Sequence, residues 1–339
     1  MTLDQRIKND LTELYSSGLK ELIEKYNQCK IVEAEKLSIA LFGKPDELSS
    51  HGLPGYFTGD RSARTVMVML NPGQDVAGKD NPGTTQKTMD LLGININNFI
   101  DTYKVGNAKF GTYDRIKREK DTRETKKAKN VYPDNFDLKQ AAFLKEWPKD
   151  CGVVIPDSFP PKDHKLENMD YEEALTTAEN VLTQKLQLEL VPYASRKFNG
   201  ISREKMECLF PYVATLLDEI FSENYKGEKP RYVIFCSAFF EKLFDAYNDA
   251  DAKEYPGWIK IIDQKEEKVP SILDKTVSCS LIKIHRYGKE NDNQGGPSIK
   301  AIIAHTFPSQ ALPNAYGRMR EYGKYCWDLY KEYLKPNEI

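Results

Sequence analysis

The stretch Arg64–Asp75, R-T-V-M-V-M-L-N-P-G-Q-D, decides the fold predicted for this chain. Its first part, Thr65–Leu70, is short and almost entirely apolar, as in a strand that is buried on both faces of a sheet. The strand is expected to end abruptly at Asn71-Pro72-Gly73, because asparagine and glycine accept turn conformations and proline fixes φ.

Similar apolar runs alternate with amphipathic patterns along the rest of the chain. Strands are predicted at 186–191, 232–236, 280–285 and 299–304, and helices at 136–147, 171–184, 206–220, 239–247 and 315–334. This alternation predicts an α/β fold, a three-layer α/β/α arrangement around a mostly parallel central sheet.

We expect one domain that spans residues 1–339, with two additions to its core. Apolar residues recur at helical spacing over 3–27 and predict an amphipathic N-terminal helix. Between 75 and 148 the hydrophobic periodicity weakens, and 104–129 holds ten Lys or Arg against four Asp or Glu. This basic insertion is too poor in apolar residues to form a core of its own. It either contacts nucleic-acid phosphates or is a solvated charged surface.

Composition and charge exclude several classes of protein. The 339 residues include 49 Lys or Arg and 51 Asp or Glu, so the net charge of −2 gives no global attraction to nucleic acid or anionic membranes. The apolar stretches are far too short for a membrane span, and the N-terminus lacks the apolar core of a secretory signal, which predicts a cytoplasmic protein. The closest two of the six cysteines, Cys208 and Cys236, are 28 positions apart. This spacing argues against a metal site and favours reduced, buried thiols.

Three loops follow predicted strands and contain the candidate functional residues. They are Asn71–Asp75, the loop that begins Pro192-Tyr193, and His305–Asn314 (HTFPSQALPN). Ligands of a parallel sheet bind outside the carboxyl ends of its strands, where such loops lie. Together these motifs resemble the uracil-DNA glycosylase superfamily over most of the chain. The first is similar to the Asn-Pro-Gly loop of the mismatch-specific and single-strand-selective branches, and Gly55–Asp60 (GYFTGD) is typical of many bacterial glycosylase-like proteins.

The resemblance implies a hydrolase that flips uracil or another altered base out of DNA and cleaves its N-glycosidic bond, with no cofactor, membrane or obligate protein partner. Such cleavage needs a positioned water and stabilisation of negative charge on the departing base. By resemblance, Asn71 would hold the water, Asp75 would be a general base or second orienting group, and His305 would donate to the base. Substrate contacts would come from Pro72, Gly73, Gln74, Tyr193, Phe307, Pro308, Ser309 and Leu312, with Ser309 on a phosphate and Leu312 as a wedge.

The last motif departs from the family pattern. Most active members have His-Pro-Ser or Asn-Pro-Ser at this strand end, whereas this chain has Phe307-Pro308-Ser309, with His305 two positions earlier. Phe307 cannot donate a hydrogen bond, although it could stack on a base. Either His305 reaches the site from a shifted register, or the leaving group is stabilised differently.

Other interpretations stay open. The whole chain could be a non-catalytic nucleic-acid or nucleotide-binding protein that keeps the glycosylase fold, or an enzyme acting on free nucleosides or small nucleotides. At single positions, Asn71–Gly73 could be an ordinary turn, His305 a structural residue, and Leu312 part of the core.

Overall fold

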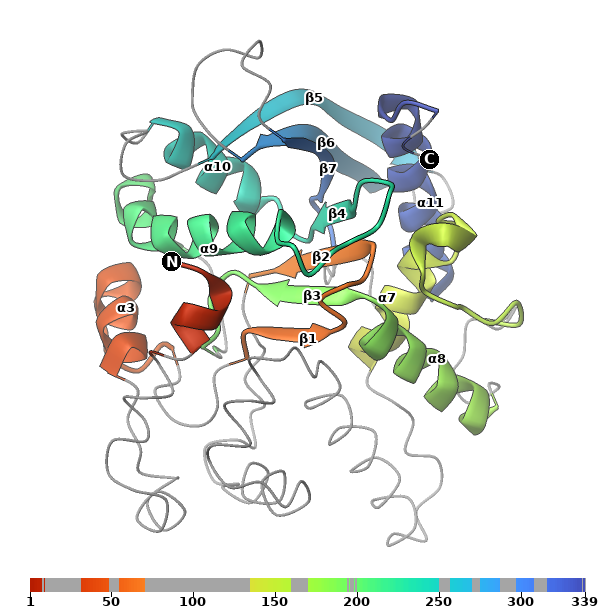
Figure 1. The fold of residues 1–339 in the computed structure, drawn as a ribbon, viewed down its shortest axis with the longest axis horizontal. Coiled ribbons are helices and arrows are strands. Elements are labelled where there is room, and N and C mark those ends of the chain that lie inside the picture. The colour runs from red at the N-terminus through yellow and green to blue at the C-terminus, as the bar shows by residue number, and fades with distance from the viewer. Residues whose placement is uncertain are drawn as a thin grey trace, which may run out of the picture.

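The computed structural model describes residues 1–7, 9, 32–48, 55–70, 135–159, 170–193, 195, 198, 200–249, 257–269, 275–286, 297–307, 316–336 and 338. Within them, seven strands form one sheet in the order β1-β3-β2-β4-β7-β6-β5 (Figure 1). The strands are β1 Phe57–Gly59, β2 Thr65–Met69, β3 Leu186–Glu189, β4 Tyr232–Phe235, β5 Trp258–Val269, β6 Lys275–His285 and β7 Ser298–Ala304.

A parallel core of four neighbouring strands, β3, β2, β4 and β7, forms the middle of this sheet. β2 lies between β3 and β4, where Met69 pairs with Glu189 and Val68 pairs with Phe235. All five residues of β2 are buried. The buried strand predicted from the first apolar run is therefore confirmed, and the protein belongs to the α/β class.

The prediction that the sheet is mostly parallel is not confirmed, because three of its six neighbouring pairs are antiparallel. They are β1 with β3, β7 with β6, and β6 with β5. Only five residues separate Val269 of β5 from Lys275 of β6, too few for the crossover that a parallel pair needs. Neither β1 nor β5 was predicted. β1 has three residues, and the middle of β5 reads DQKEEK (Asp263–Lys268), a charged pattern suited to an edge strand.

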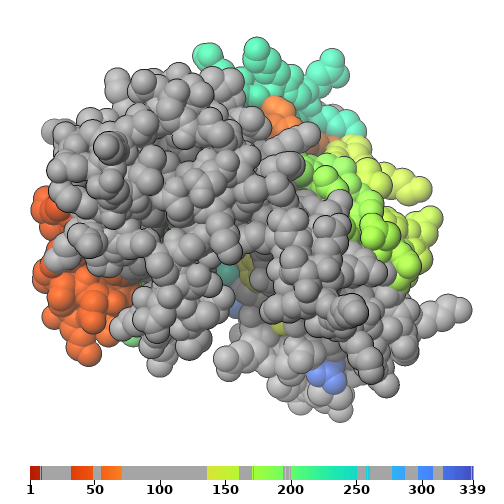
Figure 2. Space-filling model, turned by 90° about the horizontal axis from the view of Figure 1, so that it is seen from below, coloured from red at the N-terminus to blue at the C-terminus, as the bar shows by residue number. Residues whose placement is uncertain are grey.

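Helices pack on both faces of the sheet. They are α3 Val32–Phe42, α7 Asn135–Leu144, α8 Tyr171–Gln184, α9 Phe210–Ile220, α10 Phe239–Asp249 and α11 Tyr316–Tyr333, with 3-10 turns η2 Lys149–Cys151 and η4 Arg203–Leu209. Figures 1 and 2 both show α3 and α8 on opposite sides of the molecule.

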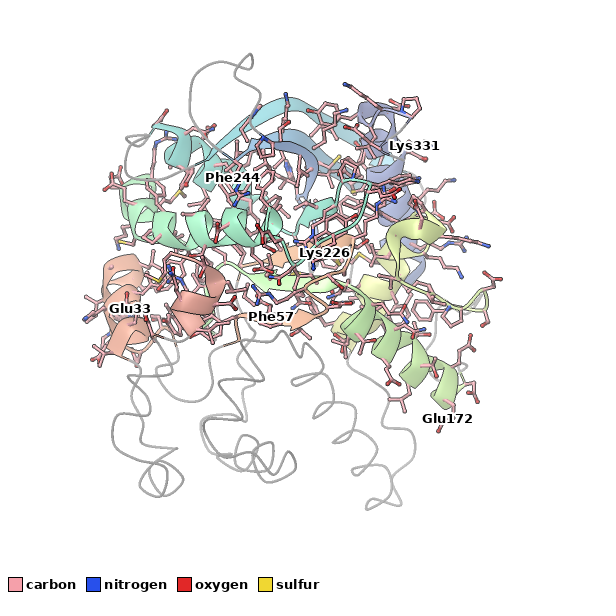
Figure 3. The ribbon with its side chains drawn as sticks, in the orientation of Figure 1. Glu33, Phe57, Glu172, Lys226, Phe244 and Lys331 are labelled. Atoms are coloured by element: carbon pink, nitrogen blue, oxygen red, sulfur yellow. The ribbon has the colours of Figure 1, made fainter. Side chains whose placement is uncertain are left out.

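Two hydrophobic cores fill the spaces between helices and sheet. One joins α3, α9 and α10 to Val66 and Val68 of β2, and the other joins α7, α8 and α11 to Met67 and Met69. Successive side chains of a strand alternate between its faces, so β2 contributes to both cores. In the first core, the ring of Phe244 of α10 (labelled in Figure 3) lies 4.9 Å from that of Phe235.

Most predicted helices are confirmed within a few residues. The pattern at 206–220 is divided into η4 and α9. Pro211 occupies the first turn of α9, where a backbone N–H would have no partner within the helix. The helix α3 was not predicted. Of the helix expected at 3–27, residues 3–7 and 9 are helical, and the remainder lies outside the described residues, as do residues 75–134 of the basic insertion.

The GYFTGD motif has a structural explanation at Gly59. This residue has φ near 100°, and a Cβ there would lie 1.7 Å from the carbonyl oxygen of Lys185. Only glycine allows β1 to approach the start of β3 this closely. Among the described helices, none has the length and apolar character needed to cross a membrane.

Candidate active site

The carboxyl ends of the four parallel strands meet at one edge of the sheet, which we call the carboxyl edge. The first described helices after β2 are α7 and α8, which lie on one face of the sheet, whereas α10, the helix after β4, lies on the other face. Such a reversal is a topological switch point, and ligands of α/β sheets bind in the crevice beside it. The carboxyl edge at β2 and β4 is therefore the candidate active site.

The three loops identified from the sequence all begin at this edge. The N–H of Val191 donates to the carbonyl oxygen of Leu70 at 2.9 Å, so the chain leaves β2 and β3 side by side. The third loop follows Ala304, at the end of β7. Eight of the predicted site residues lie outside the described residues: Asn71, Pro72, Gly73, Gln74, Asp75, Pro308, Ser309 and Leu312.

His305 is held by side chains of β6 and α10. Its Nδ1 lies 2.9 Å from Oγ of Ser278, and its Nε2 lies 2.9 Å from Oγ of Ser280. The Ser280 hydroxyl donates to Oε1 of Glu241 at 2.5 Å, and that oxygen lies 3.7 Å from Nε2. The side chains of His305 and Glu241 are 13% and 20% exposed.

These contacts define the proton positions in the neutral form of the ring. Because the Ser280 hydroxyl gives its hydrogen to Glu241, its oxygen accepts from Nε2–H of His305. Nδ1 then accepts from the hydroxyl of Ser278. Both ring nitrogens are therefore occupied within the protein, and His305 could donate to a base only by exchanging one of these serines.

The rings of Phe307 and Tyr193 lie in the core. Phe307 is 3% exposed, and its centroid lies 5.1 Å from that of Phe143 and 6.3 Å from that of Phe136, both in α7. Tyr193 is 1% exposed. Because both rings pack against neighbouring apolar side chains, neither presents a face on which a base could stack.

A column of polar side chains on β3 was missed by the sequence analysis. Leu186 and Leu188 belong to the α9 and α10 core, so the intervening Gln187 and Glu189 face the side of the sheet covered by α7 and α8. Nζ of Lys185 donates to Oε1 of Gln187 at 3.0 Å, and Nε2 of Gln187 donates to Oε1 of Glu189 at 2.7 Å. The second carboxyl oxygen, Oε2 of Glu189, is buried and has no hydrogen-bond partner among the described residues.

The surroundings of Glu189 favour its neutral form. Burial raises the pKa of this carboxyl to about 8, against the opposing effects of the Gln187 hydrogen bond and the Lys185 charge. Carboxyl groups with strongly shifted pKa values concentrate at functional sites. A signal was present in the sequence, since strands of a buried parallel core are usually apolar at every position and LQLELV is not.

The described thiols show neither nucleophilic nor metal-binding features. Cys236 follows Phe235, the partner of Val68, and therefore lies beside Met69 in line with Glu189. Burial raises the pKa of its thiol, so the reactive thiolate is suppressed. Cys151, Cys236, Cys279 and Cys326 are buried, as expected, and Cys208 is half-buried. The described residues contain no cluster of three His, Cys, Asp or Glu side chains suited to a metal.

No protein-family model, curated protein or solved structure matches this chain. The resemblance to the glycosylases therefore rests on the sequence motifs.

Proposed function

We propose that this protein is a DNA glycosylase-like hydrolase that cleaves the N-glycosidic bond of uracil or another altered base flipped out of DNA. One observation carries the proposal: the loops after Leu70, Val191 and Ala304 all begin at the carboxyl edge of one parallel core, beside its switch point. The strands that precede three motifs distant in the sequence therefore end at the same edge of the sheet. A three-layer glycosylase-like architecture, with DNA as partner, belongs to the same proposal.

The reaction replaces the bond between C1′ and the base with a bond between C1′ and a water oxygen. Asn71 orients the water through its side-chain carbonyl, and Asp75 accepts the water proton as the oxygen bonds to C1′. The electron pair of the broken bond goes to the base, which needs a hydrogen-bond donor at its oxygen. Ser309 contacts a phosphate, and Leu312 fills the space that the flipped base leaves in the stack.

A non-catalytic nucleic-acid or nucleotide-binding protein is the second candidate. Two observations favour it: both nitrogens of His305 are occupied by serines, and Phe307 is buried. If no other group donates to the base, this site can hold a nucleotide without cleaving it.

The test is incubation of the purified protein with end-labelled oligonucleotides carrying uracil, hypoxanthine, hydroxymethyluracil, or thymine opposite guanine. Alkaline treatment converts each abasic site into a strand break. We expect breaks at one of these bases, and a rate lower by on the order of 10²-fold or more in Asn71→Ala. The matched control is Val154→Ala, because Val154 is 62% exposed on the surface and lies outside the proposed site.

Full cleavage by Asn71→Ala would contradict the assignment of Asn71. Absence of cleavage on every substrate, together with salt-sensitive retention of DNA, would identify the second candidate, because phosphate contacts weaken steeply with added salt.

A further inference from the structure

We infer that Glu189, with a proton on Oε2, is the group that donates a hydrogen bond to the oxygen of the leaving base. This inference deepens the proposed function and rests on it. Phe307 has no hydrogen to donate, and both ring nitrogens of His305 are engaged by Ser278 and Ser280. Glu189 supplies the hydrogen-bond donor that neither of these residues provides.

The position of Glu189 in the sheet is the first support. It is the last residue of β3 and pairs in register with Met69 of β2. Leu70, the residue after β2, directly precedes the Asn71 loop, and Cys236, the residue after β4, lies on the other side of Met69. Glu189 is half-buried as a residue, so it stands at the boundary between the core and the carboxyl edge.

The direction of the hydrogen bonds along the β3 column is the second support. Lys185 can only donate, so the amide oxygen of Gln187 accepts and its nitrogen is turned toward Glu189. Oε1 of Glu189 is thereby fixed as an acceptor, and the proton of a neutral carboxyl resides on Oε2. That oxygen is buried without a partner among the described residues, a state that is unfavourable unless a ligand satisfies it.

The helix that covers this face provides the third support. Gln140 of α7 is fully buried, and both polar atoms of its amide lack a partner within the described chain. The start of α7 is at the carboxyl edge, because Phe136 contacts Phe307 just beyond β7. Gln140 on α7 and Glu189 on β3 are thus two side chains with buried, unsatisfied polar atoms within the described residues, and such groups are rare in proteins.

The electrostatic surroundings agree with a neutral donor. Lys185, just before β3, and Cys236, just after β4, are the titratable neighbours on the sheet, and the covering helices add Asp137 and Lys139 on α7 and Glu172, Glu173 and Glu179 on α8. Lys185 is the cation that affects the pKa of Glu189, and burial outweighs its effect, so that pKa stays near 8. At neutral pH most molecules therefore carry the proton on this carboxyl.

The chemistry balances without a further reactant. The electron pair of the C1′–N bond passes to the base, its charge develops on a carbonyl oxygen of the base, and the Oε2 hydroxyl of Glu189 donates a hydrogen bond to that oxygen. The water oxygen bonds to C1′ and one water proton passes to Asp75; Asp75 returns this proton through solvent to the departing base, so both carboxyl groups end as they began. Above pH 8 the carboxylate has no proton to donate and repels the developing anion.

The experiment uses two readouts so that the inference and the proposed function can fail separately. The first is the pH profile of cleavage of the uracil oligonucleotide. Wild type is expected to lose activity as the pH rises through about 8, and Glu189→Ala is expected to be slower on the order of 10²-fold at neutral pH. Glu189→Gln keeps a neutral donor and should retain partial activity without the alkaline loss. Glu172→Gln, at the exposed outer end of α8 (Figure 3), is the matched control.

The second readout is equilibrium binding of a fluorescent uracil-containing oligonucleotide to Asn71→Ala, which does not depend on cleavage. Adding Glu189→Ala should weaken binding on the order of tenfold, and binding should fall as the pH passes 8 unless Glu189→Gln is present. If binding changes neither with Glu189→Ala nor with pH, the inference is overturned, whether or not wild type cleaves DNA. An alkaline loss of activity that persists in Glu189→Gln would also overturn it. Binding that depends on Glu189 in a protein that never cleaves would support the inference and refute the proposed hydrolase.

Discussion

A carboxyl group that keeps its proton near neutral pH makes the stability of the protein depend on pH, and Glu189 is such a group. In the unfolded chain its pKa is near 4.5, and in the folded protein burial raises the pKa to about 8. Below pH 4.5 both states hold the proton. Between 4.5 and 8 the unfolded chain releases it and the folded protein does not, so the free energy of unfolding falls as the pH rises through this window.

Glu189→Gln should remove this dependence, because a glutamine has no proton to lose. We expect the variant to gain stability over wild type progressively from pH 4.5 to 8, by on the order of a few kcal/mol at the upper end. Urea denaturation at several pH values in this window measures the difference. Glu172→Gln, which is exposed, should follow wild type, and parallel curves for Glu189→Gln and wild type would show that Glu189 ionises normally. A gain in stability with a loss of function is typical of a residue kept for activity.

At the residue scale, the sequence predicted positions better than orientations. The strand end at Leu70 and the loops that follow the strands could be predicted because apolar runs and turn residues are local signals. That both nitrogens of His305 contact serines of β6, and that Phe307 packs on α7, depends on pairings across the sheet. Glu189 was not predicted as a site residue, because the leucines of LQLELV alone were used to predict a strand there.

At the scale of elements, the helices α7 and α11 pack closely against each other at a glycine. A Cβ on Gly323 of α11 would lie 1.9 Å from the carbonyl oxygen of Phe143 in α7. Nε1 of Trp147 donates to the carbonyl oxygen of Gly323 at 3.2 Å, and the rings of Phe143 and Tyr322 lie 5.7 Å apart. The absence of a side chain at Gly323 therefore sets the spacing between the two helices.

Gly323→Ala should destabilise the protein even though alanine favours helices. The gain in helix propensity is roughly 1 kcal/mol, whereas overpacking against a backbone carbonyl costs about 3 kcal/mol, because no side-chain rotation relieves it. We expect a net loss of about 2 kcal/mol, measured by thermal or urea denaturation. Lys324→Ala, at the exposed neighbouring position, controls for helix propensity and should change stability little. A Gly323→Ala protein as stable as wild type would mean that the helices separate without cost.

The elements themselves were largely predictable where one pattern dominates. The helices α8, α10 and α11 and the strands β2 and β4 follow the periodicity of their apolar residues closely. The sheet order was not predictable, since strand direction depends on which neighbours a strand finds. β5 carries charges over most of its middle and joins β6 through a five-residue connection, and neither feature resembles the alternating strand and helix pattern from which a mostly parallel sheet was inferred.

At the scale of the whole molecule, the two edges of the sheet have different characters. The amino edge is joined by ion pairs: Nε of Arg61, before β2, donates to Oε1 of Glu219 in α9 at 2.8 Å, and its Nη1 contacts Asp4 at 2.7 Å. Nη1 of Arg231, before β4, donates to the backbone oxygen of Glu219 at 2.9 Å. The network links the N-terminal segment, α9 and the starts of two central strands, so it serves the assembly of the fold.

Glu219→Gln should therefore reduce stability without changing the chemistry. Glu219 is 2% exposed, and the substitution removes the negative charge that compensates two buried arginines, which costs on the order of 3–5 kcal/mol when one partner of a buried pair is lost. Urea denaturation should show this loss, while the activity or DNA binding of the folded fraction stays at the wild-type level, because the network lies at the edge opposite the Asn71 loop and Glu189. By contrast, Glu189→Gln is expected to raise stability and to reduce activity. If Glu219→Gln altered the pH profile of the reaction, the two edges would be coupled, and the carboxyl edge would not contain the whole site.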